Sequence, residues 1–509
     1  MILLSGETET LRFAEDVALV LGPGDCLCLC GDLGAGKSTL ARAIVRCLSG
    51  DDALEVPSPT FTLVQSYETT RGPLAHFDLY RLADAGELEE TGFADALTRG
   101  IVVVEWPERA EAAMPDGALW LQLEIAEGGA ARTVSIAGDT PWQTRLARSF
   151  AVRRLLSEAG YATAARRPLQ GDASSRSYER IRADGRSMVL MNWPAPPPAP
   201  PLADGRSYAD VAHVQSTPAA FLAVAHTLAD RGFVAPRLVA GSAADRLMLL
   251  TDLGGEGLLD EAGRPLPERY VAAAEVLADL HEENWPRRVD LGDVFNDGVP
   301  LAHELPDYDE GALETELGLY LDWWIPHVTG RPATEDERAA FHEAFAPLVA
   351  DLRAAEQSWT LRDVHSPNLI WQPGERGRRR VGLIDVQDAM VGPAAYDLAS
   401  LVYDARVDID AALQHDMIAA YAAQRGRSMD DAEMRRFMHA FRMSAIQRNV
   451  KILGGFARLA RRDGKPGYLT HVPRILGYLD RVMGEPVLPA LSLWYERQTS
   501  LLPETSLPF

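Results

Sequence analysis

The feature that most restricts how this chain can fold is the segment GDLGAGKS, Gly31–Ser38. It fits the pattern G-x-x-x-x-G-K-[ST] and lies between the apolar run CLCLC and the helix-forming run TLARAIVRCL. In a strand–loop–helix context the glycines let backbone N–H groups surround phosphate oxygens, and the helix N-terminus adds positive potential. We therefore predict an ATP site in which Lys37 reaches the phosphates and the Ser38 hydroxyl binds Mg²⁺. The nucleotide-binding residues expected here are Gly31, Asp32, Gly34, Ala35, Gly36, Lys37, Ser38 and Thr39.

Length and charge limit what else the chain can be. At 509 residues it exceeds the size at which one hydrophobic core keeps growing, so two or three domains are expected. A net charge of −23 argues against a broad basic face for nucleic acid. There is no run of about 18 apolar residues, and the first residues lack a basic segment, so we expect no membrane span and no secretory signal. A cytoplasmic protein is the resulting expectation.

Two patterns of secondary structure divide the chain near residue 145. Up to about residue 140, short apolar runs alternate with helical stretches, which predicts an α/β domain with a mainly parallel sheet covered on both faces. Beyond it, Asp184-Gly185 separates two β-prone runs, as in a hairpin, and the chain is mainly helical from about residue 265. We predict domains at residues 1–145 and 146–490, the second with an α+β fold.

Two acids complete the expected phosphate site in the first domain. Asp78 ends the apolar run LAHFD, and Glu105 ends the run GIVVVE. Acids at the C-terminal ends of parallel strands point into the crevice where nucleotide binds. Either carboxylate could hold the metal or orient the attacking water. The alternative for each is a strand-end acid that caps the next helix.

Four segments in the first 140 residues are GDLGAGKST, VPSPTFTLVQSYE, HFDLYRL and VVEWPERA. In this order and spacing they resemble the TsaE family, bacterial ATPases of tRNA threonylcarbamoyladenosine (t6A) synthesis. The resemblance implies work with the TsaD and TsaB proteins, with tRNA held mainly by that partner complex. It also implies that Lys37, Ser38 and Thr39 hold nucleotide and metal. Thr60 would act as a switch, and Asp78 and Glu105 would serve metal binding and hydrolysis.

A second phosphate signature lies in LRDVHSPNLIW, where Asp363 and Asn368 have the D-x-x-x-x-N spacing of a kinase catalytic loop. Asp385 follows in GLIDVQDA, after another apolar run. In such a site the first Asp accepts the proton of the acceptor hydroxyl, whereas the Asn and the later Asp hold Mg²⁺ against ATP. We predict these three roles for Asp363, Asn368 and Asp385.

The candidate phosphate-covering loop is GDASS, consisting of Gly171, Asp172, Ala173, Ser174 and Ser175. Its small residues allow a close backbone approach, although a turn without a ligand is the alternative. The lysine expected on the third strand of a kinase is missing, because Met191 stands there and no lysine lies between Lys37 and Lys451. A kinase fold without activity is therefore an alternative. Arg176, Arg180 or Arg182 could neutralise phosphate instead.

Further segments of the second domain are GDASSRSYERI, VLMNWPAP, LRDVHSPNLIW and GLIDVQDAMVGPAAYDLASLVYDAR. They resemble the aminoglycoside-phosphotransferase-like superfamily over about residues 150–485, and within it the AmgK branch. This implies a two-lobed, protein-kinase-like fold and MgATP-dependent phosphorylation of the C1 hydroxyl of N-acetylmuramic acid or N-acetylglucosamine in peptidoglycan recycling. The alternatives are another small acceptor, such as an aminoglycoside or a choline-like amine, and a non-catalytic scaffold.

Overall fold

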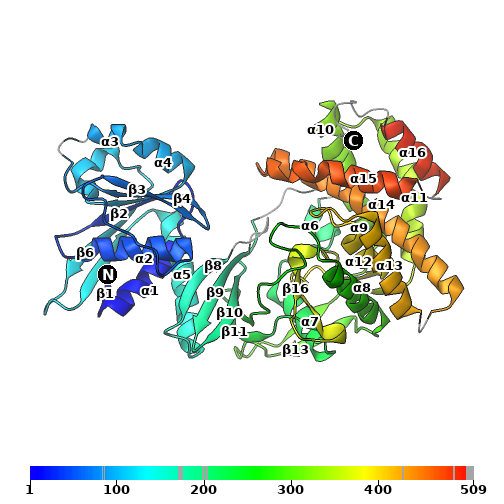
Figure 1. The fold of residues 1–509 in the computed structure, drawn as a ribbon, viewed down its shortest axis with the longest axis horizontal. Coiled ribbons are helices and arrows are strands. Elements are labelled where there is room, and N and C mark those ends of the chain that lie inside the picture. Colours follow the sequence, from blue (N-terminus) through cyan, green and yellow to red (C-terminus); the bar gives the residue numbers. More distant parts are fainter. Residues whose placement is uncertain are drawn as a thin grey trace. The chain divides into compact units, whose positions relative to one another are not determined.

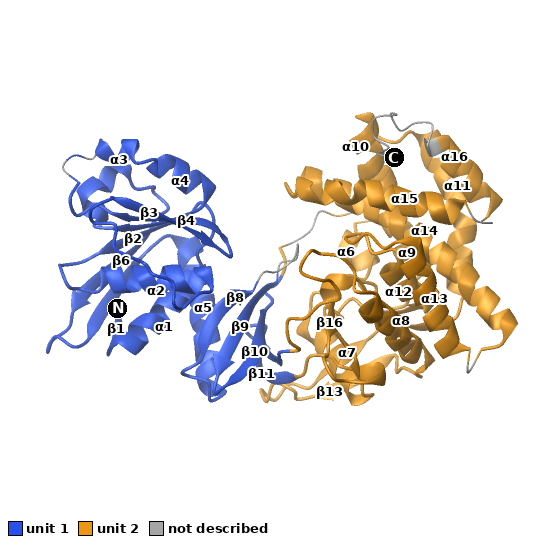
Figure 2. Cartoon of the chain, viewed as in Figure 1, with its two compact units in different colours: residues 1–195, 238–252 blue, residues 196–237, 253–509 orange. Residues whose placement is uncertain are grey.

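The computed structural model describes residues 1–82, 84, 86–169, 176–197, 201, 205–426, 429–484 and 488–499. The chain forms two compact units, one of residues 1–195 and 238–252 and the other of residues 196–237 and 253–509 (Figure 2). Within the described residues, no helix is both long and apolar enough to cross a bilayer.

The first unit begins with a seven-stranded sheet in the order β1-β7-β6-β2-β5-β4-β3. Figure 1 labels its strands β1, β2, β3, β4 and β6. Its centre, β6-β2-β5-β4, is parallel, whereas the pairs β1–β7, β6–β7 and β3–β4 are antiparallel. The predicted mainly parallel sheet is thus confirmed. The strands are β1 (Ile2–Leu4), β2 (Cys26–Cys30), β3 (Val64–Thr69), β4 (Gly72–Asp78), β5 (Ile101–Glu105), β6 (Leu119–Ile125) and β7 (Arg132–Ala137).

Helices cover both faces of this sheet, as its apolar strands require. Alternate residues of β2 enter different cores: Leu27 and Leu29 pack on one side, and Cys26 and Cys28 on the other. The helices of this part are α1 (Glu7–Ala18), α2 (Lys37–Ser49), α3 (Glu87–Glu90), α4 (Phe93–Arg99), the 3₁₀ helix η1 (Pro107–Ala113) and α5 (Thr140–Glu158). The predicted domain boundary near residue 145 lies within α5 and stays a prediction.

The same unit holds a second, wholly antiparallel sheet in the order β11-β12-β10-β9-β8. The predicted hairpin is present: Asp184 and Gly185 link β9 to β10, and both have positive φ, as a two-residue turn between twisted strands requires. Apolar side chains of α5 pack on this sheet. The strands are β8 (Ala165–Leu169), β9 (Ser177–Ala183), β10 (Arg186–Asn192), β11 (Leu238–Ser242) and β12 (Leu247–Thr251).

The described residues of the second unit are mainly helical and include three two-stranded sheets, β13–β14, β15–β18 and β16–β17. Its long helix α14 (Asp431–Arg462) crosses the end of α9 (Glu310–Leu319), where the π-helical turn η2 (Tyr320–Trp324) begins. The two are so close that a Cβ at Gly454 would lie 2.2 Å from the Leu319 carbonyl carbon. Its strands are β13 (Arg288–Gly292), β14 (Leu301–Glu304), β15 (Gln357–Thr360), β16 (Leu369–Trp371), β17 (Val381–Leu383) and β18 (Met390–Pro393). Its helices are α6 (Tyr208–Val211), α7 (Pro218–Asp230), α8 (Pro267–Glu282), α9 (Glu310–Leu319), η2 (Tyr320–Trp324), α10 (Ile325–Thr329), α11 (Glu335–Ala354), η3 (Ser366–Asn368), η4 (Gly377–Arg379), α12 (Ala395–Val402), α13 (Ala411–Arg425), α14 (Asp431–Arg462), η5 (Pro466–His471), α15 (Val472–Met483) and α16 (Pro489–Thr499).

Candidate active sites

The glycine loop between β2 and α2 has the backbone that phosphate binding requires. Gly31, Gly34 and Gly36 all have positive φ, and a Cβ at Gly31 would lie 2.3 Å from the Leu123 carbonyl oxygen. Lys37 opens α2 and donates from Nζ to the carbonyl oxygens of Gly31 (2.5 Å) and Asp32 (3.0 Å). The loop therefore has the strand–loop–helix context that the sequence predicts, with its lysine turned back over the loop.

The indole ring of Trp106 packs against the ammonium group of Lys37. The ammonium lies 3.5 Å from the centroid of the indole ring, within the range of a cation–π contact. Burial lowers the pKa of Lys37, although nearby carboxylates, Glu105 first among them, favour its charged form. Trp106 follows β5 directly and has a left-handed backbone conformation, a strained geometry of the kind found at functional sites.

The two predicted acids lie side by side at the ends of neighbouring strands. Asp78 and Glu105 are paired across β4 and β5, and both are almost fully buried. The Ser38 hydroxyl donates to Glu105 Oε2 (2.6 Å). The Thr60 hydroxyl donates to Asp78 Oδ2 (2.7 Å). Asp78 Oδ1 also accepts the Tyr80 N–H, so this carboxylate has a local turn role beside its place in the site.

These groups face one cavity of about 300 Å³. A hydroxyl, two carboxylates and a glycine cradle fit a nucleotide with its Mg²⁺, because oxygen ligands and phosphates are what this ion prefers. The cavity brings together most of the predicted residues. Its lining consists of Leu33, Gly34, Gly36, Lys37, Ser38, Thr39, Ser58, Thr60, Asp78, Tyr80, Glu105 and Trp106.

Sequence reasoning gave no role to two further side chains of this site. The Ser58 hydroxyl donates to Asp78 Oδ2 (2.9 Å) beside Thr60. His76 is fully buried on β4, and its Nε2 lies 3.0 Å from Glu105 Oε1, the carboxylate oxygen that does not accept from Ser38. His76 precedes Asp78 by two residues and so shares its face of the strand. That spacing in HFDLYRL was the available signal.

The predicted kinase loop is held mainly through its backbone. The N–H groups of Leu361 and Arg362 donate to the two carboxylate oxygens of Asp397, at 2.7 and 2.9 Å. The Asn368 side chain donates to the Asp363 carbonyl oxygen (2.9 Å), which closes the loop. Arg362 has φ of 69°, so the turn is strained at the residue before the proposed base.

A short β-hairpin brings the third predicted residue to the loop. β16 and β17 are antiparallel, and the Ile384 N–H donates to the Asn368 carbonyl oxygen (3.1 Å). Asp385 therefore follows a residue bonded directly to Asn368, and it too has positive φ (59°). Burial opposes the charge on Asp363, but Lys451 and then His365 hold the pKa of this carboxyl below its usual value. Asp363 is thus a carboxylate, as a general base must be.

Sequence reasoning did not find the buried polar cluster behind this loop. Glu316 is fully buried and accepts from Lys451 Nζ (2.6 Å) and Gln447 Nε2 (3.0 Å), and it also pairs with Arg362. Burial would raise the pKa of Glu316, but Lys451 and Arg362 outweigh it and lower that pKa to about 2. The Arg362 side chain, next to Asp363, is therefore fixed from inside the helical unit.

The remaining predicted nucleotide-binding residues, Gly171, Asp172, Ala173, Ser174 and Ser175, lie outside the described residues. Met191 lies on β10, buried between Tyr178 of β9 and Met248 of β12 in the strand register. Arg180, suggested as a substitute cation, forms an ion pair with Asp252 (3.3 Å).

Comparisons with known proteins match two separate stretches of the chain. A family model described as threonylcarbamoyl adenosine biosynthesis protein TsaE matches residues 4–134, and one described as phosphotransferase enzyme family matches residues 165–436. An N-acetylmuramate/N-acetylglucosamine kinase of Caulobacter vibrioides is 32% identical over 361 residues, 69% of this chain and 96% of that protein. The TsaE protein of Aquifex aeolicus is 41% identical over 108 residues, 21% of this chain and 77% of that protein. The chain therefore belongs to the TsaE family in its N-terminal part and to the phosphotransferase enzyme family in its C-terminal part.

Proposed function

We propose that the chain is a bifunctional enzyme with two separate ATP sites. Its N-terminal part hydrolyses ATP in support of t6A synthesis, together with TsaD and TsaB proteins that hold the tRNA. Its C-terminal part transfers a phosphoryl group to the C1 hydroxyl of N-acetylmuramic acid or N-acetylglucosamine. The relatives' names support these two assignments.

In the ATPase site, the observation that supports the proposal is the convergence of Ser38, Thr60, Asp78 and Glu105 on one cavity. Lys37 would neutralise the β- and γ-phosphates, and Ser38 would hold Mg²⁺. Asp78 and Glu105 would hold the metal and orient the attacking water. Thr60 bonds to Asp78 and would respond to what that carboxylate binds.

In the kinase site, the supporting observation is the bonded path from Asp363 through Asn368 to the residue before Asp385. Asp363 would accept the proton of the sugar hydroxyl, because its carboxyl is held ionised. Asn368 and Asp385 would hold Mg²⁺, which supplies charge stabilisation for the transferring phosphoryl group.

The acceptor is tested by screening the purified full-length protein with labelled ATP against amino sugars, aminoglycosides and choline-like amines. We expect labelled N-acetylmuramic acid and N-acetylglucosamine. Labelling of an aminoglycoside or an amine alone would change the acceptor but keep the enzyme class. No labelled product with any acceptor would support the non-catalytic scaffold instead.

The ATPase role is tested by t6A formation in a mixture of TsaD, TsaB, tRNA and the full-length protein. We expect formation to depend on the wild-type chain and to be lost with Lys37→Ala. Equal formation with both proteins would contradict this role.

A further inference from the structure

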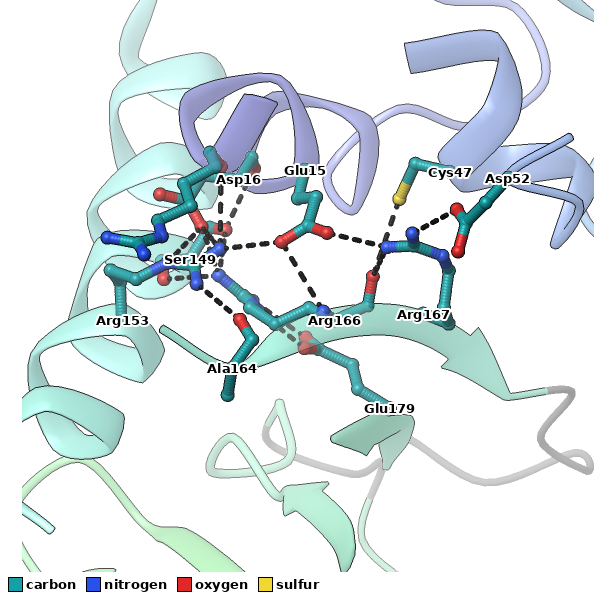
Figure 3. Close-up of polar contacts among 11 residues, drawn as sticks. Glu15, Asp16, Cys47, Asp52, Ser149, Arg153, Ala164, Arg166, Arg167 and Glu179 are labelled. Carbon is teal, nitrogen blue, oxygen red and sulfur yellow. Dashed lines mark hydrogen bonds and ion pairs between the residues drawn. The ribbon is translucent and has the colours of Figure 1, made fainter. Parts of the chain in front are cut away.

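The ATPase part and the antiparallel sheet of the kinase part share one buried ion-pair network, all of it within the first compact unit (Figure 3). Its centre is Arg166 on β8, whose side chain is fully buried. Arg166 forms a two-pronged pair with Glu179 of β9, at 2.7 and 2.9 Å, and it also donates to Asp16 of α1 at 2.5 Å. One guanidinium thus joins both strands β8 and β9 to the first helix of the ATPase part.

Helix α1 presents two buried carboxylates to this sheet. Glu15 and Asp16 are 9% and 5% exposed, which is unusual for acids unless they are paired. Glu15 accepts from Arg167 of β8 (2.6 Å) and from Arg153 of α5 (3.0 Å), and Asp16 accepts from Arg153 as well (3.0 Å). Their described salt-bridge partners all lie beyond residue 145, in the part of the chain assigned to the kinase.

The helix that begins at the phosphate-binding lysine reaches the same strand. Near the C-terminal end of α2, Cys47 Sγ lies 3.6 Å from the Arg166 carbonyl oxygen, and Asp52, just beyond the helix, pairs with Arg167. Apolar contact extends the junction, because Phe13 of α1 stacks on Phe150 of α5 at 6.4 Å between ring centroids. Several elements of each part therefore contribute to the junction.

Burial and ion pairing act in opposite directions on the pKa values of Arg166 and Asp16 in this junction. Burial disfavours the charge on Arg166, yet Glu179 and Asp16 outweigh it and raise the pKa of this guanidinium, so it stays charged. Burial instead raises the pKa of Asp16, although Arg166 and Arg153 oppose that shift. A charged group held in such a place depends strongly on its partners, and the loss of one partner leaves a poorly compensated buried charge.

We propose that α1 of the ATPase part is a structural component of the kinase part's antiparallel sheet, β11-β12-β10-β9-β8, with Glu15 and Asp16 as residues that position β8 and β9. This rests on the proposed kinase function for its catalytic consequence. In the sequence, β8 and β9 flank residues 170–175, among which the ATP-contacting residues of the kinase are expected. Loss of these carboxylates should therefore raise the KM of the kinase for ATP more than its KM for the sugar.

The test uses the full-length chain with Asp16→Asn, Glu15→Gln and the double variant, each of which keeps side-chain size. Glu7→Gln is the matched control, because Glu7 lies on the same helix but is exposed. We expect the kinase KM for ATP to rise about threefold or more in each single variant and about tenfold or more in the double variant. The KM for the sugar should change less than twofold, and Glu7→Gln should match the wild type.

A second readout needs no catalysis. Amide hydrogen exchange of peptides covering β8 and β9 should be faster in the Asp16→Asn and Glu15→Gln chains than in the wild type and in Glu7→Gln. Unchanged exchange in these strands would overturn the proposal whichever acceptor the kinase uses. Equal rises in both KM values, or none, would overturn its catalytic consequence. A wild-type chain that phosphorylates no sugar would refute the proposed kinase function and leave the exchange experiment decisive for the junction.

Discussion

The two phosphate sites of this chain are built in opposite ways. In the ATPase site the functional side chains bond to one another, Ser38 to Glu105 and Thr60 to Asp78, at the ends of adjacent parallel strands. In the kinase site the predicted catalytic loop is held through its backbone by Asp397, an acid outside the proposed catalytic set. The first site therefore depends on a few functional side chains that bond to one another. The second depends on buried residues that surround the catalytic loop and hold its backbone.

The largest effect is expected at the kinase loop. Asp363→Ala removes the proposed general base and should lower the rate of sugar phosphorylation by roughly 10²–10⁴-fold. Initial rates with saturating ATP and sugar check this, and Asp336→Ala, an exposed acid on α11, serves as the control. Unchanged rates would show that Asp363 is not the base.

In the ATPase site, Lys37→Ala removes the cation that faces the phosphates. ATP hydrolysis measured without sugar should fall by about 10²–10³-fold, as for the loss of one preorganised electrostatic group. The chain contains three lysines, and the exposed Lys465 gives a matched Lys→Ala control. A similar loss in both variants would remove the basis for assigning hydrolysis to the glycine loop.

The buried ion pairs of Glu316 with Arg362 and Lys451 should make the stability of the kinase part depend on pH. The pKa of Glu316 is lowered from 4.5 to about 2 in the folded chain, so its ionised form stabilises the fold above pH 4.5, and this contribution is lost as the pH falls towards 2. The shift corresponds to about 3 kcal/mol. Glu316→Gln should therefore lower the free energy of unfolding strongly at pH 7 and progressively less below pH 4.5.

Urea unfolding of the kinase part at several pH values, followed in the full-length chain, measures this difference. Glu343→Gln on the exposed side of α11 is the control. If the difference in the free energy of unfolding between the wild type and Glu316→Gln does not decrease below pH 4.5, Glu316 acts through packing and its charge makes no contribution.

A smaller effect is expected from His76, whose Nε2 lies 3.0 Å from Glu105 Oε1. His76→Ala should reduce ATP hydrolysis by about tenfold, because a supporting partner of a functional carboxylate is lost. His76→Gln keeps a side-chain amide that can still bond to Glu105, so it should recover much of the rate. Equal loss in both variants would indicate that His76 acts only by filling the core.

The positions of the predicted ATPase residues could be derived from the sequence, because they follow from local rules. A glycine loop between an apolar strand and a helix predicts where Lys37 lies, and strand-end acids of a parallel sheet, Asp78 and Glu105, must meet at one edge. His76 was missed because its role depends on the direction of one buried side chain. That direction follows from strand periodicity only when the neighbouring strand is known.

In the kinase part, the sequence predicted the loop motif but not the buried residues that hold the loop in place. The spacing of Asp363 and Asn368 is local, and the turn at Asp184-Gly185 is set by two residues. In contrast, Glu316 lies 46 residues from Arg362 and 135 from Lys451, so no local pattern joins them. The junction around Arg166 was unforeseen for the same reason, since its partner Asp16 is 150 residues away.

The most direct test of the central claim, two separate ATP sites with different chemistry, is phosphorus NMR of the full-length protein with MgATP and N-acetylmuramic acid. We predict a sugar 1-phosphate signal that grows with ADP in the wild type, persists in Lys37→Ala and is absent in Asp363→Ala. A sugar phosphate signal that survives Asp363→Ala, or one that disappears with Lys37→Ala, would contradict the account.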